Sequence, residues 1–250
     1  MQACPVTEKR ILAAGHCRLT LKAPVLVREA YPGQFVMVYM PDEHRHMLPR
    51  PLSIFALDRQ KGELSLLFAV KGEGTRLLAG AITGSVWKLL GPLGKGFPAL
   101  PPKALLIAGG MGIAPLAFLA ASTESPRTLV YGARTASQLA CPPEDLELPG
   151  LKLIVTTEDG SRGRKGNVTD MVYPLLSDTE ALFACGPVKM LQAVVSLSEK
   201  YKKKAWVSLE ERMACGIGAC LGCVVAGKKG YSLVCSDGPV FPAKEVVLHG

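Results

Sequence analysis

Four cysteines near the C-terminus have the residue type and the spacing to hold an iron–sulfur cluster. Cys215, Cys220 and Cys223 lie in "MACGIGACLGC", and Cys235 follows in "VCSDGPVF". A C-x4-C-x2-C run with a distant fourth cysteine is the spacing of plant-type [2Fe–2S] proteins, whereas zinc ribbons usually carry two C-x2-C pairs. The spacing therefore favours a [2Fe–2S] cluster over its alternatives, a zinc ion or disulfides.

The glycines between these cysteines suit the same chemistry. Gly216, Gly218 and Gly222 let the backbone pass close to a cluster and direct amide N–H groups at sulfur. Such hydrogen bonds stabilise the negative charge of a cluster and tune its reduction potential. The chain has 8 cysteines and no signal-peptide pattern, which favours a reducing compartment and predicts a cytoplasmic location.

Two upstream motifs carry groups that suit a phosphate or a flavin. In "RPLSIF", Arg50 is a permanent cation on a backbone that Pro51 restricts, which suits a phosphate or the edge of a flavin. The alternative is that Arg50 is only an exposed arginine at the edge of a strand. In "VKGEGTRLL", Gly72 and Gly74 free backbone amides where Thr75 opens a helix-like stretch. Backbone amides at such a position form a cradle for a pyrophosphate.

A glycine turn in "LLIAGGMGIAPLAFL" has the pattern of a dinucleotide site. A strand ends at Gly109 and Gly110, turns through Gly112, and enters a helix with Pro115 in its first turn. This turn departs from the strict G-x-G-x-x-G fingerprint, but it still presents bare backbone and a helix N-terminus to a pyrophosphate. A purely structural strand-to-helix turn is the alternative.

The motif "FACGPVKML" predicts a further part of that site. Cys185 ends a strand, Gly186 allows close approach, and Pro187 opens the next helix. The carboxyl end of a parallel strand is where ligands of such sheets bind. The alternative to a role in binding is that Cys185 is only a small residue buried in the core.

The apolar patterning divides the chain into three units. Short apolar runs bounded by Gly, Pro and Asp predict an antiparallel β-barrel over residues 1–99. After a proline-rich hinge at 98–103, strands alternate with helical patterns, which predicts a parallel-sheet α/β domain over 100–204. Residues 205–250 are too few for a core of their own, so a metal or cluster would supply the missing stability. The predicted fold class is multidomain, β and α/β.

Composition argues against two classes of partner. The net charge of +8 is scattered, the densest basic run is "KYKKK" at a predicted helix end, and only 6% of residues are aromatic. We therefore expect no nucleic-acid binding. The uncharged stretch 104–123 has the length of a membrane span, but its glycines and proline indicate strand, turn and helix start, so we expect no membrane association.

The four histidines and the other three cysteines are predicted to take no part in the chemistry. No histidine has a partner at ligand or triad spacing, so all four are expected at the surface, and the other cysteines are expected to be bystanders. These residues are His16, His44, His46 and His249, with Cys4, Cys17 and Cys141.

The motifs, in this order, resemble those of the ferredoxin-reductase superfamily. Within it, the chain is similar over nearly its whole length to the electron transfer subunits of type B dihydroorotate dehydrogenase. Each motif before residue 200 is shared across the superfamily, so the combination carries the resemblance. The matching segments are "RPLSIF", "KGEGT", "GPLGKGF", "GGMGIAPL", "CGPVKML" and "ERMACGIGACLGCVV…CSDGPVF".

The resemblance implies three cofactors: FAD on the barrel, NAD on the α/β domain and a [2Fe–2S] cluster in the small C-terminal domain. Ser53, at the flavin N5 edge, and Cys185, beneath the nicotinamide, are the implied catalytic residues. The implied FAD residues are Arg50, Pro51, Leu52, Ser53, Leu67, Phe68, Ala69, Gly74 and Thr75. The implied NAD residues are Gly110, Met111, Gly112, Ile113, Ala114, Pro115, Cys185, Gly186 and Pro187. The implied cluster ligands are Cys215, Cys220, Cys223 and Cys235.

The resemblance also implies a function and a partner. Such a subunit is the NAD-linked flavoprotein component of an oxidoreductase, in a heterotetramer with an FMN-containing dihydroorotate dehydrogenase catalytic subunit. Electrons would run from dihydroorotate through FMN, cluster and FAD to NAD, in de novo pyrimidine (UMP) biosynthesis. A flavin belongs between the other two centres because it exchanges two electrons with NADH and one with a cluster.

Two rival functions share most of these motifs. One is a flavin and [2Fe–2S] subunit of another oxidoreductase, such as an NADH-dependent ferredoxin–NADP reductase or a sulfide dehydrogenase. The other is a redox sensor that carries a cluster and no flavin. The choice between NAD and NADP also stays open: Arg134 suits a 2′-phosphate, whereas Glu158 and Asp159 would disfavour one if they lie near it.

Overall fold

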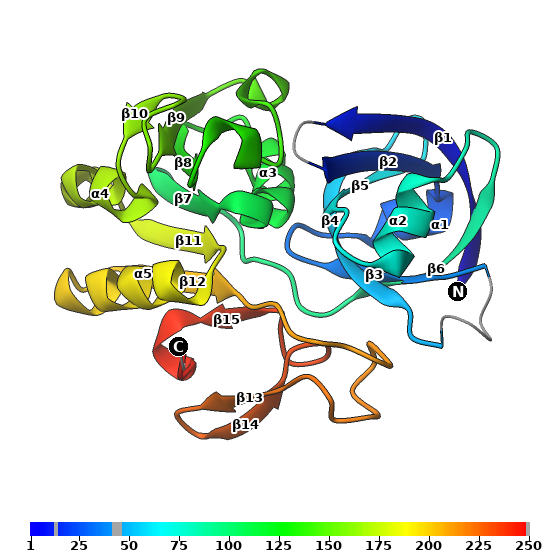
Figure 1. Cartoon of the computed structure of the whole chain (residues 1–250). Coiled ribbons are helices and arrows are strands. Elements are labelled where there is room, and N and C mark those ends of the chain that lie inside the picture. The colour runs from blue at the N-terminus through cyan, green and yellow to red at the C-terminus, as the bar shows by residue number, and fades with distance from the viewer. Residues whose placement is uncertain (13–14, 42–46, 249–250) are drawn as a thin grey trace.

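The computed structural model of the chain describes residues 1–12, 15–41 and 47–248. Figure 1 shows a barrel in blue and cyan beside an α/β unit in green and yellow, with the C-terminal segment in orange and red below both. The predictions for His44, His46 and His249 lie outside the described residues.

The N-terminal unit is the predicted antiparallel barrel. It closes in the strand order β1-β2-β5-β4-β3-β6. Side chains alternate across its wall: in β1, Cys4 and Val6 are buried while Ala3 and Pro5 are exposed. Its strands are β1 (Gln2–Leu12), β2 (His16–Lys22), β3 (Phe35–Tyr39), β4 (Arg50–Asp58), β5 (Glu63–Ala69) and β6 (Val86–Leu93), with helices α1 (Pro24–Glu29) and α2 (Glu73–Ala79).

The α/β unit contains the predicted parallel sheet. The sheet has 7 strands in the order β10-β9-β8-β7-β11-β12-β15, and only β15 runs antiparallel to its neighbour. Every residue of β7 is buried, as expected of a parallel strand covered on both faces. The strands are β7 (Ala104–Gly109), β8 (Arg127–Ala133), β9 (Leu151–Thr157), β10 (Arg164–Lys165), β11 (Ala181–Cys185), β12 (Lys204–Ser208) and β15 (Val240–Pro242). The helices are α3 (Ile113–Ala121), α4 (Val168–Val172) and α5 (Val188–Lys200).

The C-terminal segment is built into the rest of the molecule. Strands β12 and β15 extend the α/β sheet, so the sheet takes residues from both sides of the predicted boundary at 204/205. Between them lie the cysteine-rich loop and a hairpin of β13 (Val224–Gly227) and β14 (Gly230–Leu233). Cys223 and Cys235 pack in one cluster with Phe35 of the barrel and Phe241 of β15. The cysteine-rich loop therefore shares its core with both neighbours.

Helix α3 joins the barrel to the sheet. The stretch 104–123 forms β7, a glycine turn and α3, which confirms the strand–turn–helix interpretation. Phe118 packs in the barrel core, whereas Leu116 and Leu119 pack on the sheet with Phe55 of β4. No helix within the described ranges is long and apolar enough to cross a bilayer.

The prediction that His16 lies at the surface is wrong. His16 opens β2, pairs with Leu12 and Ala69 on the neighbouring strands, and is 9% exposed. An isolated histidine beside the chain start gives no periodic signal, so its place in the barrel wall was missed. Cys4, Cys17 and Cys141 are buried, and desolvation raises the pKa of these thiols to about 11, about 11 and about 12, so they stay protonated.

The glycine turn leaves no room for a side chain at Gly112. A Cβ there would overlap the backbone carbonyl of Cys185 on β11, which cannot move without breaking the sheet. Gly112→Ala is expected to lower the free energy of unfolding by about 1–3 kcal/mol, the range for an overpacked core. Gly72→Ala is the control, since nothing lies within 4 Å of that position, and we expect it to cost less than about 1 kcal/mol. Urea unfolding of both variants measures the difference; equal losses would contradict the close approach.

Candidate functional site

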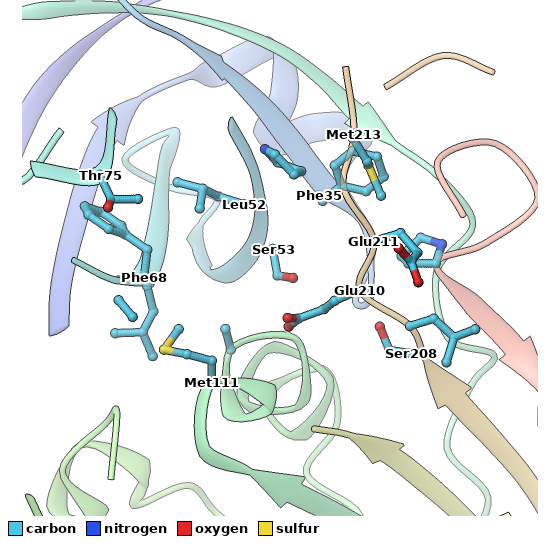
Figure 2. Close-up of a pocket in the computed structure, with 16 residues that line it drawn as sticks. Phe35, Leu52, Ser53, Phe68, Thr75, Met111, Ser208, Glu210, Glu211 and Met213 are labelled. Carbon is cyan, nitrogen blue, oxygen red and sulfur yellow. The ribbon is translucent and has the colours of Figure 1, made fainter. Parts of the chain in front are cut away.

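A cavity of about 210 Å³ lies where the barrel, α3 and the segment after β12 meet (Figure 2). Its walls bring together residues that the sequence assigned to FAD with two assigned to NAD. These lining residues are Pro51, Leu52 and Ser53 of β4, Leu67, Phe68 and Ala69 of β5, Thr75 of α2, and Met111 and Ala114 at the start of α3. An apolar cavity with a few polar groups fits the flat ring system of a flavin.

Arg50 lies against the glycine backbone of α2. A Cβ on Gly74 would be 2.6 Å from Arg50 Nε and 2.8 Å from Nη2, so only glycine lets the guanidinium lie there. The Thr75 hydroxyl accepts the N–H groups of Lys71 and Gly72, both at 3.0 Å, and fixes the loop. A forked cation held beside bare backbone fits a pyrophosphate, so these residues can hold the phosphates of FAD.

A cleft of about 680 Å³ runs along the carboxyl ends of β7, β8 and β9. Gly110, Met111 and Pro187 line it, as the sequence predicts for an NAD site. Gly112 and Gly186 line an adjoining cleft of about 550 Å³ that reaches the β13–β14 hairpin. Gly110 has φ of 53° and open space beside it, so its backbone stays accessible to a ligand.

Three residues assigned to NAD lie inside the fold. Ile113 and Pro115 are buried residues of α3 and line none of these spaces. Cys185 is 1% exposed, its thiol hydrogen-bonds Ser208, and burial raises its pKa. Its thiol therefore contacts Ser208, which itself lines the cavity.

The four cluster cysteines come together as two contacting pairs. The Cys220 N–H donates to Cys215 Sγ, and the Cys235 N–H donates to Cys223 Sγ, both at 3.4 Å. A [2Fe–2S] cluster takes two protein ligands on each iron, so pairs of thiols fit it. Across the described ranges, no three His, Cys, Asp or Glu side chains are grouped for a single metal ion.

Backbone amides point at the cysteine sulfurs. The N–H groups of Ile217 and Cys220 lie 3.5 and 3.4 Å from Cys215 Sγ, and they lower the pKa of that thiol to about 6. The Gly218 N–H donates to Cys235 Sγ at 3.1 Å. Gly218 has φ of 83°, a conformation that favours glycine, so the predicted role of the loop glycines fits the geometry.

Glu210 is a site residue that the sequence analysis missed. It follows β12, lines both the flavin cavity and the adjoining cleft, and points into the cavity on the side of Ser53 (Figure 2). The residue is exposed, yet the protein around its carboxyl raises its pKa by desolvation, while the charge of Lys71 lowers it. Its position after the last parallel strand was the available signal, since ligands bind at that edge.

Two family models match the chain. The iron–sulfur cluster binding domain of dihydroorotate dehydrogenase B matches residues 210–247, and the oxidoreductase NAD-binding domain matches residues 106–196. The first covers the whole cysteine-rich loop, and the second covers the glycine turn and the Cys185 strand. They support the two binding regions that the geometry indicates.

Curated relatives match almost the full chain. The electron transfer subunit of dihydroorotate dehydrogenase B (NAD(+)) from Bacillus cereus (strain Q1) is 39% identical over 259 residues, with 97% of each chain covered. The protein of that name from Bacillus anthracis (strain CDC 684 / NRRL 3495) shows the same identity and coverage.

Solved structures share the architecture. An NADH-dependent reduced ferredoxin–NADP oxidoreductase, described for flavin-based electron bifurcation, aligns with a TM-score of 0.88 and 28% identity, covering 99% of this chain and 91% of that one. A ferredoxin reductase of carbazole 1,9a-dioxygenase aligns with a TM-score of 0.66 and 21% identity, covering 80% and 65%, and shows the fold alone.

The raised pKa of Glu210 sets a direction for the pH dependence of stability. Between its unfolded pKa of about 4.3 and its higher folded pKa, the folded chain holds more protons than the unfolded chain, so the free energy of unfolding falls as pH rises. Glu210→Gln removes this loss and is expected to unfold at a higher temperature than the wild type, by more at pH 7 than at pH 4. Thermal unfolding of flavin-loaded protein measures it, with Glu211→Gln, an exposed neighbour, as the control. A gap that widens toward low pH would contradict the assignment.

Proposed function

The chain belongs to the family of electron transfer subunits of dihydroorotate dehydrogenase B, and we propose that it passes electrons between a dihydroorotate-oxidising subunit and NAD in pyrimidine biosynthesis. When bound, FAD exchanges electron pairs with the nicotinamide and single electrons with the [2Fe–2S] cluster. The protein positions these groups and needs no acid–base pair of its own to move electrons.

The observation that carries this proposal is the position of the flavin cavity between the other two sites. Ala69 and Met111 line both this cavity and the large cleft, so ligands in the two spaces would be neighbours. On the opposite side, Met213 lines the cavity two residues before Cys215. A Cβ on Gly216 would lie 2.6 Å from Met37 Cγ in the barrel, so the cysteine-rich loop packs closely there.

Different side chains would hold the flavin, the nicotinamide and the cluster. We propose that Arg50 binds the FAD phosphates and that Ser53 orients the reactive edge of the flavin. Cys185, whose thiol meets Ser208, supports the nicotinamide side of the cavity. The amides directed at the cysteine sulfurs stabilise the charge of the cluster, and the apolar cavity wall excludes water.

The surface around the exposed cluster cysteine suits a protein partner. Cys220 is exposed, and Ile217 and Leu221 beside it are 60% and 62% exposed. Exposed apolar side chains around a redox centre suit contact with a partner protein. We propose that the FMN-containing catalytic subunit docks here in a heterotetramer, and that the complex is cytoplasmic, where the eight free cysteines stay reduced.

The similarity to an NADH-dependent ferredoxin–NADP oxidoreductase supports a second candidate function, the flavin subunit of such an enzyme. The catalytic partner distinguishes the two. Affinity purification of the tagged chain from its native cells should bring down a subunit that makes the complex reduce NAD with dihydroorotate. A complex that reduces ferredoxin and is inert to dihydroorotate would overturn the proposal.

The cleft suggests which nicotinamide is preferred. Arg134 and Glu158, at the ends of β8 and β9, both line it, and the Glu158 N–H bonds the Ala133 carbonyl at 3.2 Å. A carboxylate there would repel a 2′-phosphate. Glu158→Gln is expected to improve the NADPH-to-NADH ratio of kcat/KM by about tenfold, an ordinary charge effect in recognition. Lys152→Gln, a charge change at an exposed position on β9, is the control, and an unchanged ratio in Glu158→Gln would contradict the assignment.

Cys220→Ser tests the role of the cluster. We expect loss of the cluster absorbance and of dihydroorotate-dependent NAD reduction in the complex, because one iron loses a thiolate ligand. Reduction of an artificial dye by NADH should stay near the wild-type rate, since it needs only the flavin and nicotinamide sites. Cys141→Ala, which removes a cysteine outside the loop, should keep both activities. Loss of the dye activity in Cys220→Ser would show that the loop is needed to form the flavin site.

A further inference from the structure

Met111 lies where the flavin cavity, the large cleft and the adjoining cleft meet. Its side chain lines all three spaces, and among the described residues no other does so. Figure 2 shows it extending from the start of α3 toward Phe68 of β5. Met111 also packs against the apolar core that contains Leu67 of β5 and Ala114 of α3. One side chain therefore forms part of the wall between the flavin cavity and both clefts.

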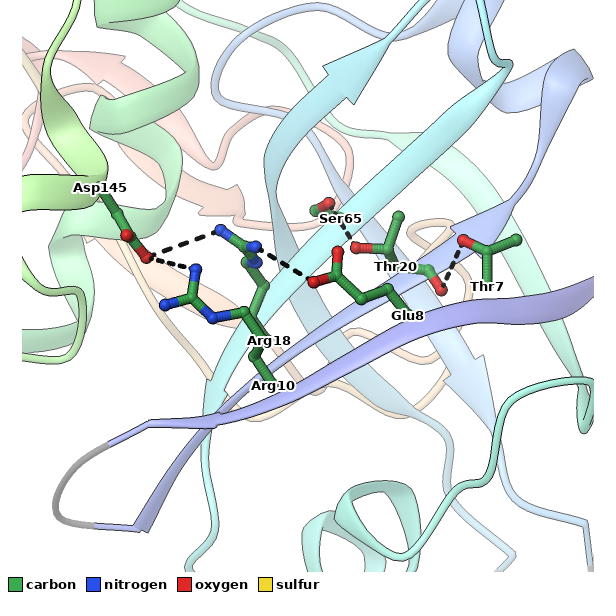
Figure 3. Close-up of polar contacts among 7 residues, drawn as sticks. All are labelled: Thr7, Glu8, Arg10, Arg18, Thr20, Ser65 and Asp145. Atoms are coloured by element: carbon green, nitrogen blue, oxygen red, sulfur yellow. Dashed lines mark hydrogen bonds and ion pairs between the residues drawn. The ribbon is translucent and has the colours of Figure 1, made fainter.

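The barrel and the α/β unit, which meet at this wall, are held together at two places. Helix α3 packs Phe118 into the barrel core. In addition, Asp145 Oδ2 of the α/β unit lies 3.1 Å from Arg10 Nη1 of β1 and 3.7 Å from Arg18 Nη1 of β2 (Figure 3). Separating the units to join the flavin cavity to the large cleft would break both sets of contacts. Rotation of a side chain in the wall opens a path between the two spaces at a lower cost.

The residue type and its surroundings allow that rotation. Methionine is unbranched and has three rotatable bonds, so its side chain adapts to the space around it. Met111 is half-buried and adjoins clefts of about 680 and 550 Å³, which leave room for a displaced side chain. Gly110 before it has nothing within 4 Å of the position of a Cβ, so the neighbouring backbone leaves that room free.

We infer that Met111 controls the access of the nicotinamide ring to the flavin, because its side chain occupies the passage and must turn aside before the two rings can meet. This inference rests on the proposed placement of FAD in the cavity and of NAD in the large cleft. Hydride transfer needs the reacting atoms about 3–3.5 Å apart, so the rings have to be in contact. The ADP-ribose part of the dinucleotide binds in the cleft without displacing Met111.

Displacement of this side chain uses part of the binding free energy of the nicotinamide. When only a fraction of the protein is competent to bind, the apparent dissociation constant is the intrinsic constant divided by that fraction. The fraction with Met111 turned aside therefore limits the affinity for NAD+ and has no effect on the affinity for ADP-ribose. A merely structural role of Met111 would change both affinities together.

The test is titration of the oxidised, flavin-loaded protein with NAD+ and, separately, with ADP-ribose. Met111→Ala removes the obstruction and is expected to tighten NAD+ binding about three- to tenfold, with Kd for ADP-ribose unchanged. Met111→Ile keeps the obstruction on a stiff, β-branched side chain, so NAD+ binding should weaken and flavin reduction by NADH in a single anaerobic turnover should slow. The two variants shift NAD+ affinity in opposite directions, so either tests the inference if the other folds poorly. Weaker NAD+ binding in Met111→Ala, or equal changes for both ligands, would overturn it.

Two further variants separate the possible failures. Met171→Ala removes a half-buried methionine of α4 that lines none of the three spaces, and it should leave both dissociation constants unchanged. Gln138→Trp should obstruct the large cleft and weaken both ligands; unchanged affinity for both would overturn the placement of NAD itself. If Gln138→Trp weakens both ligands but Met111→Ala leaves NAD+ affinity unchanged, the role of Met111 is overturned while the proposed function stands.

Discussion

Helix α3 is buried on both sides, and the arrangement of the whole molecule depends on that. Phe118 packs into the barrel, while Leu116 and Leu119 pack on the sheet. Each such side chain contributes about 1.5–3 kcal/mol when buried, so the two units cannot separate here without a large loss. The close contact of Gly112 with the Cys185 carbonyl brings the start of this helix to the sheet edge. The flavin cavity, the large cleft and the adjoining cleft all meet at this point.

The charges around that junction have complementary roles. Arg50 provides a cation against the Gly74 backbone, a position that suits the phosphates of a nucleotide. Glu210 is held across the cavity from β4, where the surrounding protein disfavours its charged form. A carboxyl whose charged form is disfavoured would place less negative charge beside a flavin ring bound in this cavity. The protein therefore has a cation at the start of α2 and a carboxyl with a raised pKa at the cavity.

The sequence predicted the parts of the fold that local pattern determines. Glycine turns, apolar strands and the cysteine spacing have short-range causes, so the barrel, the parallel sheet and the stretch 104–123 were placed correctly. The buried position of His16, the addition of β12 and β15 to the α/β sheet, and the role of Glu210 depend on contacts between distant segments. Cys185 shows the same limit: its strand end was predicted, but its burial behind Ser208 follows from packing with β12. Roles for individual site residues stay predictions for that reason.

Contacts with neighbouring elements hold the cysteine-rich loop in place, since the loop is too short to form a core of its own. Its inner cysteines, Cys223 and Cys235, pack with Phe35 of the barrel, so the loop is anchored beside the wall of the flavin cavity. Its outer pair is different: Cys215 is half-buried, and Cys220 is exposed. Two thiols held against the protein and two directed outward give the cluster site an inner and an outer side. The exposed Cys220 leaves the outer side of the site open, while the inner pair packs beside Phe35 of the barrel.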